Sequence, residues 1–160
     1  MRPELVKLEM TTIPPELPEN GSRAKWVLGV KEAIISELLE VLDPLARIGN
    51  RHKLLVDFMN RERKASTGIG RGFALPHIRS MQAKEFMIAF GRSHHGYEYD
   101  AMDGQPVNFF FIMAAPPYDD SLYLKVFKAM SELIQFDGFA EQLMAAEKPY
   151  DVIQAVRSLE

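Results

Sequence analysis

The sequence has 160 residues, of which 47% are hydrophobic and 26% are charged, and this is the composition of a globular protein with a substantial core. A net charge of −3 excludes a strongly basic nucleic-acid-binding protein, and no stretch of about 18 uninterrupted apolar residues offers direct membrane insertion. The absence of cysteine excludes disulfides, thiolate catalysis and cysteine-ligated zinc. The first residues lack the apolar core of a signal peptide, so we expect a cytoplasmic protein whose residues 1–160 form one domain.

The first half of the chain predicts an irregular N-terminal region followed by two helices. Residues 5–10 form a candidate strand, and the prolines and the Asn-Gly pair of residues 13–21 predict a surface loop. Apolar residues then recur at helical spacing from an N-cap at Ser22 to a point before Pro44. A second amphipathic helix is expected over residues 51–63, directly before a glycine-rich segment.

The second half of the chain contains both extended and helical patterns. Residues 86–90 and 107–113 predict buried strands, and the turn-rich connection between them comprises residues 94–96 and 102–106. Helical spacing returns over residues 122–134, and a last helix is expected over residues 151–159. Strands and helices that mix along the chain favour an α/β fold, a single layered domain with helices packed on a sheet.

The glycine-rich segment between the two halves has the spacing Gly-x-Gly-x-Gly, formed by Gly68, Gly70 and Gly72. This spacing fits neither the Walker phosphate loop nor the dinucleotide-binding fingerprint. Glycines nevertheless allow positive φ and close approach of the backbone, so their N–H groups can converge on an anion. The hydroxyls of Ser66 and Thr67 would add donors, and we therefore predict phosphate-binding roles for Ser66, Thr67, Gly68 and Gly70.

A Pro-His pair closes this segment. Pro76 restrains the residue before it to extended backbone and so positions His77 at the exit of the loop. A neutral imidazole is nucleophilic and titrates near pH ~6.5, so it can attack phosphorus without a separate strong base. From these residues alone two interpretations stay open: a phosphoryl acceptor beside an anion-binding loop, or a structural histidine after a tight connection.

Residues 61–77 read Arg-Glu-Arg-Lys-Ala-Ser-Thr-Gly-Ile-Gly-Arg-Gly-Phe-Ala-Leu-Pro-His. This run resembles, without a gap, the pattern of phosphotransferase-system EIIA domains of the fructose–mannitol class, which includes the nitrogen-regulatory EIIA proteins. A second matching block lies within residues 91–107. The resemblance extends from Glu32 to the C-terminus, and the Pro-rich loop at residues 13–21 looks like an insertion relative to it.

The resemblance implies a mixed β-sheet flanked by helices on both faces, and a phosphotransferase component that needs no cofactor. His77 would accept a phosphoryl group from phosphorylated HPr, or from the nitrogen-branch relative of HPr, and would pass it to a cysteine of an EIIB domain. Arg61 matches the active-site arginine of the family, although on its own it would be interpreted as a solvated charge at a helix end. The alternative output is that of a nitrogen-regulatory EIIA module, which binds regulatory target proteins in a phosphorylation-dependent manner.

One position departs from the family pattern. The resemblance implies a second histidine where this chain has Tyr123, and a tyrosine carries no positive charge at neutral pH. Transfer would then be slow or tuned for a different partner, unless Tyr123 is simply a packing aromatic. The remaining histidines are weaker candidates, since His52 fits an exposed helix start and the adjacent His94 and His95 fit a solvated turn. We expect no metal site.

Overall fold

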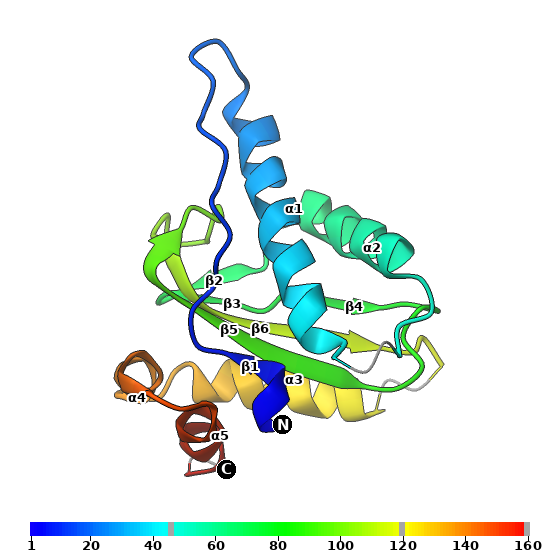
Figure 1. The fold of residues 1–160 in the computed structure, drawn as a ribbon, viewed down its shortest axis with the longest axis vertical. Coiled ribbons are helices and arrows are strands. Elements are labelled where there is room, and N and C mark those ends of the chain that lie inside the picture. Colours follow the sequence, from blue (N-terminus) through cyan, green and yellow to red (C-terminus); the bar gives the residue numbers. More distant parts are fainter. Residues whose placement is uncertain (45–46, 119–120, 159–160) are drawn as a thin grey trace.

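The molecule is built on a mixed β-sheet that is covered by helices on both faces, as the sequence predicts (Figure 1). The computed structural model describes residues 1–44, 47–118 and 121–158. Within these residues the chain forms, in order, the 3-10 turn η1 (Pro3–Leu5), β1 (Val6–Lys7), α1 (Arg23–Leu42), α2 (Arg51–Lys64), β2 (Gly68–Gly70), β3 (Phe73–Ala74), β4 (His77–Arg79), β5 (Met87–Tyr97), β6 (Val107–Ala115), α3 (Ser121–Leu133), α4 (Phe139–Ala145) and α5 (Pro149–Ser158).

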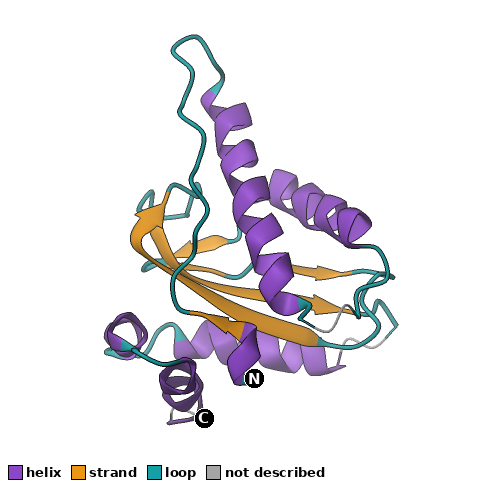
Figure 2. Ribbon diagram, in the orientation of Figure 1, coloured by secondary structure: helices purple, strands orange, loops and turns teal. Residues whose placement is uncertain are grey.

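The strands of the described residues form one six-stranded sheet in the order β1-β5-β6-β3-β2, and β4 also pairs with β6. β5 and β6 form a long antiparallel ladder, in which Phe90 lies opposite Phe111. β1 runs parallel to β5, and both β3 and β4 run parallel to β6. Helices α1 and α2 cover one face of this sheet, whereas α3, α4 and α5 cover the other (Figure 2).

The core has two layers, and β6 contributes to both. Because side chains alternate along a strand, Phe110 and Ile112 pack with the residues of α1 and α2, while Phe109 and Phe111 pack with those of α3, α4 and α5. This burial on both sides explains why the strand reads as a continuous apolar run from Phe109 to Met113, after the polar Asn108.

The two long helices begin as the sequence predicts. The side chain of Ser22 caps α1 by accepting a hydrogen bond from the backbone N–H of Lys25, and Asn50 caps α2 through the N–H of Lys53. α1 ends at Leu42, before Pro44. Among the helices of the described residues, none combines the length and the apolar character that crossing a membrane requires.

The turn predicted at residues 94–96 is wrong, because β5 continues as a strand to Tyr97. The ladder with β6 is irregular between Arg92 and Tyr97, and Gly96 has a positive φ of 79°. The apolar run ends at Phe90 and is followed by the buried polar residues Arg92 and Ser93 and the exposed His94 and His95, so hydrophobicity gave no signal that the strand goes on.

Two further boundaries and one helix differ from the expectations. The candidate strand at residues 5–10 is reduced to Val6–Lys7. Helix α4 was not expected, because it is only 7 residues long and begins after Gly138, whose φ is 88°. The last helix begins at Pro149 and is described as far as Ser158, so the expected end at residue 159 lies outside the described residues.

The segment between β1 and α1 is an irregular arm that extends along α1 and projects beyond the sheet (Figure 1). Glu37, on α1, holds the base of this arm. Its carboxylate accepts hydrogen bonds from the backbone N–H groups of Thr11 (2.7 Å) and Thr12 (2.8 Å), and it pairs with the ammonium of Lys7 at 2.7 Å. The loop predicted at residues 13–21 lies in this arm, and its status as an insertion stays a prediction.

Candidate functional site

The glycine-rich segment folds as a β-hairpin, in which β2 and β3 pair antiparallel. The turn is formed by Gly70, Arg71 and Gly72, with φ values of 97°, 60° and 85°. The backbone N–H of Arg71 donates to the carboxylate of Asp103 at 3.0 Å, which stabilises a left-handed conformation that is unusual for a residue with a side chain. Gly68 is required for a different reason, because a Cβ atom there would lie 2.9 Å from the Cα of Ala101.

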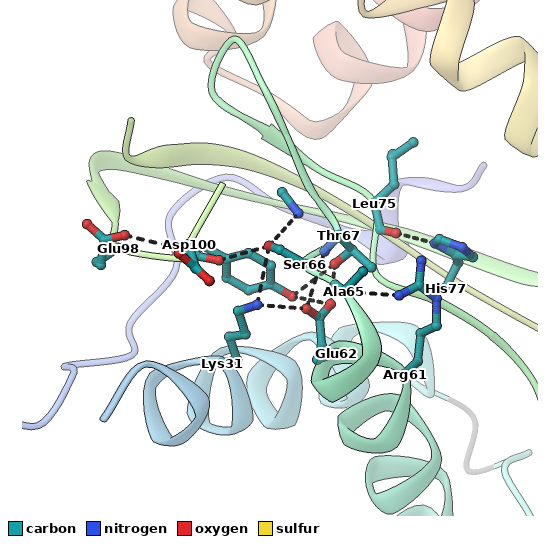
Figure 3. Close-up of polar contacts among 12 residues, drawn as sticks. Lys31, Arg61, Glu62, Ala65, Ser66, Thr67, Leu75, His77, Glu98 and Asp100 are labelled. Carbon is teal, nitrogen blue, oxygen red and sulfur yellow. Dashed lines mark hydrogen bonds and ion pairs between the residues drawn. The ribbon is translucent and has the colours of Figure 1, made fainter. Parts of the chain in front are cut away.

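A buried polar network lies between the hairpin and the two long helices (Figure 3). Its centre is the carboxylate of Glu62, in the last turns of α2. This carboxylate pairs with the ammonium of Lys31 at 3.0 Å and accepts hydrogen bonds from the hydroxyls of Tyr99, at 2.9 Å, and Thr67. Lys31 and Glu62 are only 2% and 4% exposed, so each charge depends on the other. The network fixes the end of α2 to the start of the hairpin.

Sequence reasoning assigned no role to the three residues that define this network. Glu62 stood in the quoted motif beside Arg61, Lys31 lay in a helical pattern, and Tyr99 lay in the second matching block. A carboxylate in the last turns of a helix was one signal, because such a position disfavours a negative charge unless the charge is paired.

The side chains of Ser66 and Thr67 are directed into this network. The Ser66 oxygen lies 3.3 Å from the Lys31 ammonium, donates to the Tyr99 carbonyl at 3.2 Å and accepts from the N–H of Gly68 at 3.2 Å. Thr67 is 2% exposed, and its hydroxyl donates to Glu62. The phosphate-binding roles expected for Ser66, Thr67, Gly68 and Gly70 stay predictions, and the hydrogen bonds of the two hydroxyls do not favour them.

His77 opens β4 and has a defined tautomer. Its Nδ1 lies 2.5 Å from the carbonyl oxygen of Leu75, and since a carbonyl can only accept, Nδ1 carries the proton. Burial lowers the pKa of His77, and the positive charge of Arg61 acts in the same direction, whereas the Leu75 carbonyl and the charge of Glu62 raise it. The neutral imidazole therefore dominates at neutral pH, with a lone pair on Nε2.

Arg61 lies beside His77, on the last turns of α2 (Figure 3). Its guanidinium donates to the carbonyl oxygen of Ala65 at 2.8 Å, which satisfies an acceptor at the helix C-terminus. Arg61 is thus a helix-end cation that also lines a cavity with His77, and its role as an active-site arginine stays a prediction. The bond to Ala65 uses one of the five N–H donors of the guanidinium.

The cavity at His77 has a volume of about 480 Å³, and it is lined by Arg61, His77, Ile78, Arg79, Pro117 and Tyr123. The rings of Tyr123 and Phe127, both on α3, lie 6.1 and 4.7 Å from the His77 ring, measured between centroids. Tyr123 is 8% exposed, and burial raises the pKa of its hydroxyl, so it stays neutral at physiological pH. Arg79 was not expected in the site.

The other histidines lie outside this cavity. His94 and His95 are exposed on β5, and His94 pairs with Glu9 across to the N-terminal segment. His52 is exposed in the first turn of α2. Within the described residues, no group of three or more potential metal-ligating side chains comes together.

Comparison with known proteins identifies the family of the chain. Residues 27–158 match the family model described as the phosphoenolpyruvate-dependent sugar phosphotransferase system, EIIA 2. The chain belongs to this EIIA family. Phosphotransfer is the chemistry of EIIA domains, and the cavity around His77 lies within the matched residues.

Two relatives and one solved structure illustrate the similarity. The chain is 34% identical over 126 residues to the fructose-specific EIIABC component of Bacillus subtilis (strain 168), and this alignment covers 79% of the chain but only 20% of that protein. It is 30% identical over 122 residues to the fructose-specific EIIA component of Haloferax volcanii, covering 76% of the chain and 79% of that protein. The crystal structure of the nitrogen regulatory protein IIA-Ntr from Neisseria meningitidis has the same fold, with a TM-score of 0.78 at 23% identity over 97% of this chain and 94% of that one.

Proposed function

We propose that this EIIA domain accepts a phosphoryl group on Nε2 of His77 from phosphorylated HPr, or from the nitrogen-branch relative of HPr, and passes it to a cysteine of an EIIB domain. The observation that carries the proposal is the 2.5 Å contact between His77 Nδ1 and the Leu75 carbonyl, because it leaves Nε2 as the nucleophilic nitrogen. The similar Bacillus subtilis protein is named as a component with EIIA, EIIB and EIIC parts, which supports an EIIB acceptor.

The reaction proceeds by displacement at phosphorus. The lone pair of His77 Nε2 forms the new P–N bond, while the P–N bond to the donor imidazole breaks and its electron pair returns to the donor nitrogen. The proton on Nδ1 stays in place, held by the Leu75 carbonyl, so the product imidazolium is stabilised without a proton transfer. Arg61 lines the same cavity, and its remaining N–H donors are suited to the oxygens of the phosphoryl group.

The hairpin and the buried network serve this chemistry as a support. Glu62 joins α2, which carries Arg61, to Thr67 at the start of the hairpin. The backbone N–H of Leu75, two residues before His77, then donates to the Thr67 carbonyl at 3.0 Å. These contacts together fix the position of Arg61 relative to His77. Such positioning is required because the negative charge in the transition state is spread over the phosphate oxygens.

The experiment is to incubate the protein with HPr phosphorylated by phosphoenolpyruvate and enzyme I, and to map the acid-labile phosphate by mass spectrometry. We expect one phosphoryl group, on His77, and none in His77→Ala. His94→Ala is the matched control and should be labelled like the wild type, because His94 is exposed and pairs with Glu9. Phosphate on His94 or His95, or phosphate persisting in His77→Ala, contradicts the proposal.

Onward transfer separates the two outputs left open by the sequence. A phosphocarrier delivers its phosphoryl group to the cysteine of an isolated EIIB domain within a single encounter. If the labelled protein retains its phosphate in the presence of EIIB domains of the same cell, while binding other proteins only in one phosphorylation state, the regulatory function replaces the carrier function.

A further inference from the structure

We propose that Arg79 is a second catalytic cation of this site, which contacts the phosphoryl group together with Arg61 and supplies a positive charge that Tyr123 cannot. This inference rests on the proposed phosphoryl transfer at His77 and adds to it a residue that the sequence pattern does not assign. Its basis is the position of Arg79 on the strand that carries the acceptor, within the cavity of that acceptor.

The strand geometry directs Arg79 to the side on which His77 reacts. β4 runs from His77 to Arg79, and side chains two positions apart on a strand point to the same face. The intervening Ile78 also borders the cavity, but its side chain packs against the core layer of α1 and α2. His77, by contrast, lies against Tyr123 and Phe127 of α3. The guanidinium of Arg79 therefore leaves the strand toward the α3 side.

Tyr123 provides a platform for this guanidinium. The Cζ atom of Arg79 lies over the Tyr123 ring, 5.8 Å from its centroid, which is within the range of a cation–π contact. The same ring lies 6.1 Å from the His77 ring. Tyr123 thus brings the cation to the wall of the cavity next to the nucleophile, and its contribution comes from its aromatic face and not from its hydroxyl.

The charge of the reacting group requires more than one cation. A phosphoryl group carries about two negative charges at neutral pH, and these spread over three oxygens in the transition state. Arg61 and Arg79 line the cavity of His77 and also a neighbouring cavity of about 350 Å³, so they stand where the two cavities meet. Arg61 belongs to α2 and Arg79 belongs to β4, so the two guanidinium groups would contact the phosphoryl group from two different elements.

The test measures single-turnover labelling of His77 with phosphoramidate, a small donor whose P–N bond breaks to release ammonia. A donor without protein surface isolates the charge at the site from any role of Arg79 in docking. We expect Arg79→Gln to slow labelling by at least about tenfold and Arg79→Lys to retain most of the rate. Arg157→Gln on α5, which removes one exposed positive charge elsewhere, is the matched control for net charge and should react like the wild type.

Tyr123 variants then test the platform. Tyr123→Phe keeps the ring and should retain the rate, whereas Tyr123→Ala should slow labelling nearly as much as Arg79→Gln. Tyr123→His places an ionisable ring at the same point, so it should restore most of the rate lost in Arg79→Gln when the two substitutions are combined. A structural role for Arg79 would not produce such a rescue. Thermal unfolding of each variant checks that the fold is retained.

Several results overturn the inference. Labelling of Arg79→Gln by phosphoramidate at the wild-type rate refutes a catalytic role. If Arg79→Gln slows labelling by phosphorylated HPr but not by phosphoramidate, Arg79 acts in partner docking, and a catalytic role is again refuted. If wild-type His77 is labelled by neither donor, the proposed function itself fails, and this outcome is distinct from one in which only Arg79 proves dispensable.

Discussion

Replacement of Lys31 by methionine should destabilise the fold, because it leaves the carboxylate of Glu62 buried without its ion-pair partner. The two charged atoms lie 3.0 Å apart, and the residues are 2% and 4% exposed. Breaking a buried ion pair costs about 3–5 kcal/mol, and the donors that Tyr99 and Thr67 still offer to Glu62 reduce this to about 2–4 kcal/mol. Methionine has a similar volume, so the loss comes from charge and not from a cavity.

The assay is urea unfolding followed by far-UV circular dichroism. Lys25→Met is the matched control, since Lys25 is exposed on the same helix and its replacement should change the free energy of unfolding by less than about 0.5 kcal/mol. In a Glu62→Gln background the Lys31→Met change should cost clearly less, because no buried charge is left unpaired. Equal losses in the two backgrounds would refute the reasoning and show that Lys31 stabilises the fold through its aliphatic stem.

Three further predictions concern the site and its support. Arg61→Ala should slow phosphoryl transfer while changing the unfolding free energy by less than about 1 kcal/mol, and a large fall in melting temperature with unchanged transfer would contradict this. The pKa of Glu37 is lowered to about 2 from its usual 4.5, so its stabilisation is complete above pH 4.5 and disappears as the pH falls toward 2. Acid titration of unfolding should show a loss of about 3 kcal/mol over that range, absent in Glu37→Gln. Gly68→Ala should destabilise the fold by about 1–3 kcal/mol, because the new methyl group would lie 2.9 Å from the Ala101 backbone; Gly29→Ala, with nothing within 4 Å, should stabilise it by about 0.5–1 kcal/mol, and urea midpoints compare the two.

The parts of the fold that the sequence predicts are those that local forces decide. The N-cap at Ser22 and the apolar stripe behind it define α1. The run at residues 107–113 defines β6, because burial of the strand on both faces leaves a continuous apolar signal from Phe109 onward. The course of β5 beyond Phe90 could not be read in this way. Its outer part is held by backbone pairing to β6, and that pairing has no counterpart in side-chain hydrophobicity.

The residues of the candidate site likewise separate into those that a local sequence pattern reveals and those that only tertiary packing brings together. His77 and Arg61 were found from a contiguous pattern, and the cavity brings them together. Lys31 could not be found, because its partner Glu62 is 31 residues away and only the packing of α1 on α2 joins them. Arg79 was missed because its side chain can be placed on the same face as His77 only once residues 77–79 are known to form a strand.

The imidazole of His77, the proposed phosphoryl acceptor, is oriented by the main chain of its own segment, through the carbonyl oxygen two residues before it. No substitution of a side chain can delete that acceptor. In the proposed reaction, the identity of the attacking nitrogen is therefore independent of the other residues that line the cavity, which come from α2, β4, α3 and Pro117. In the proposed transfer, substitution of a wall residue such as Tyr123 changes the speed of transfer or the choice of partner, while the backbone contact preserves the nitrogen of His77 that reacts.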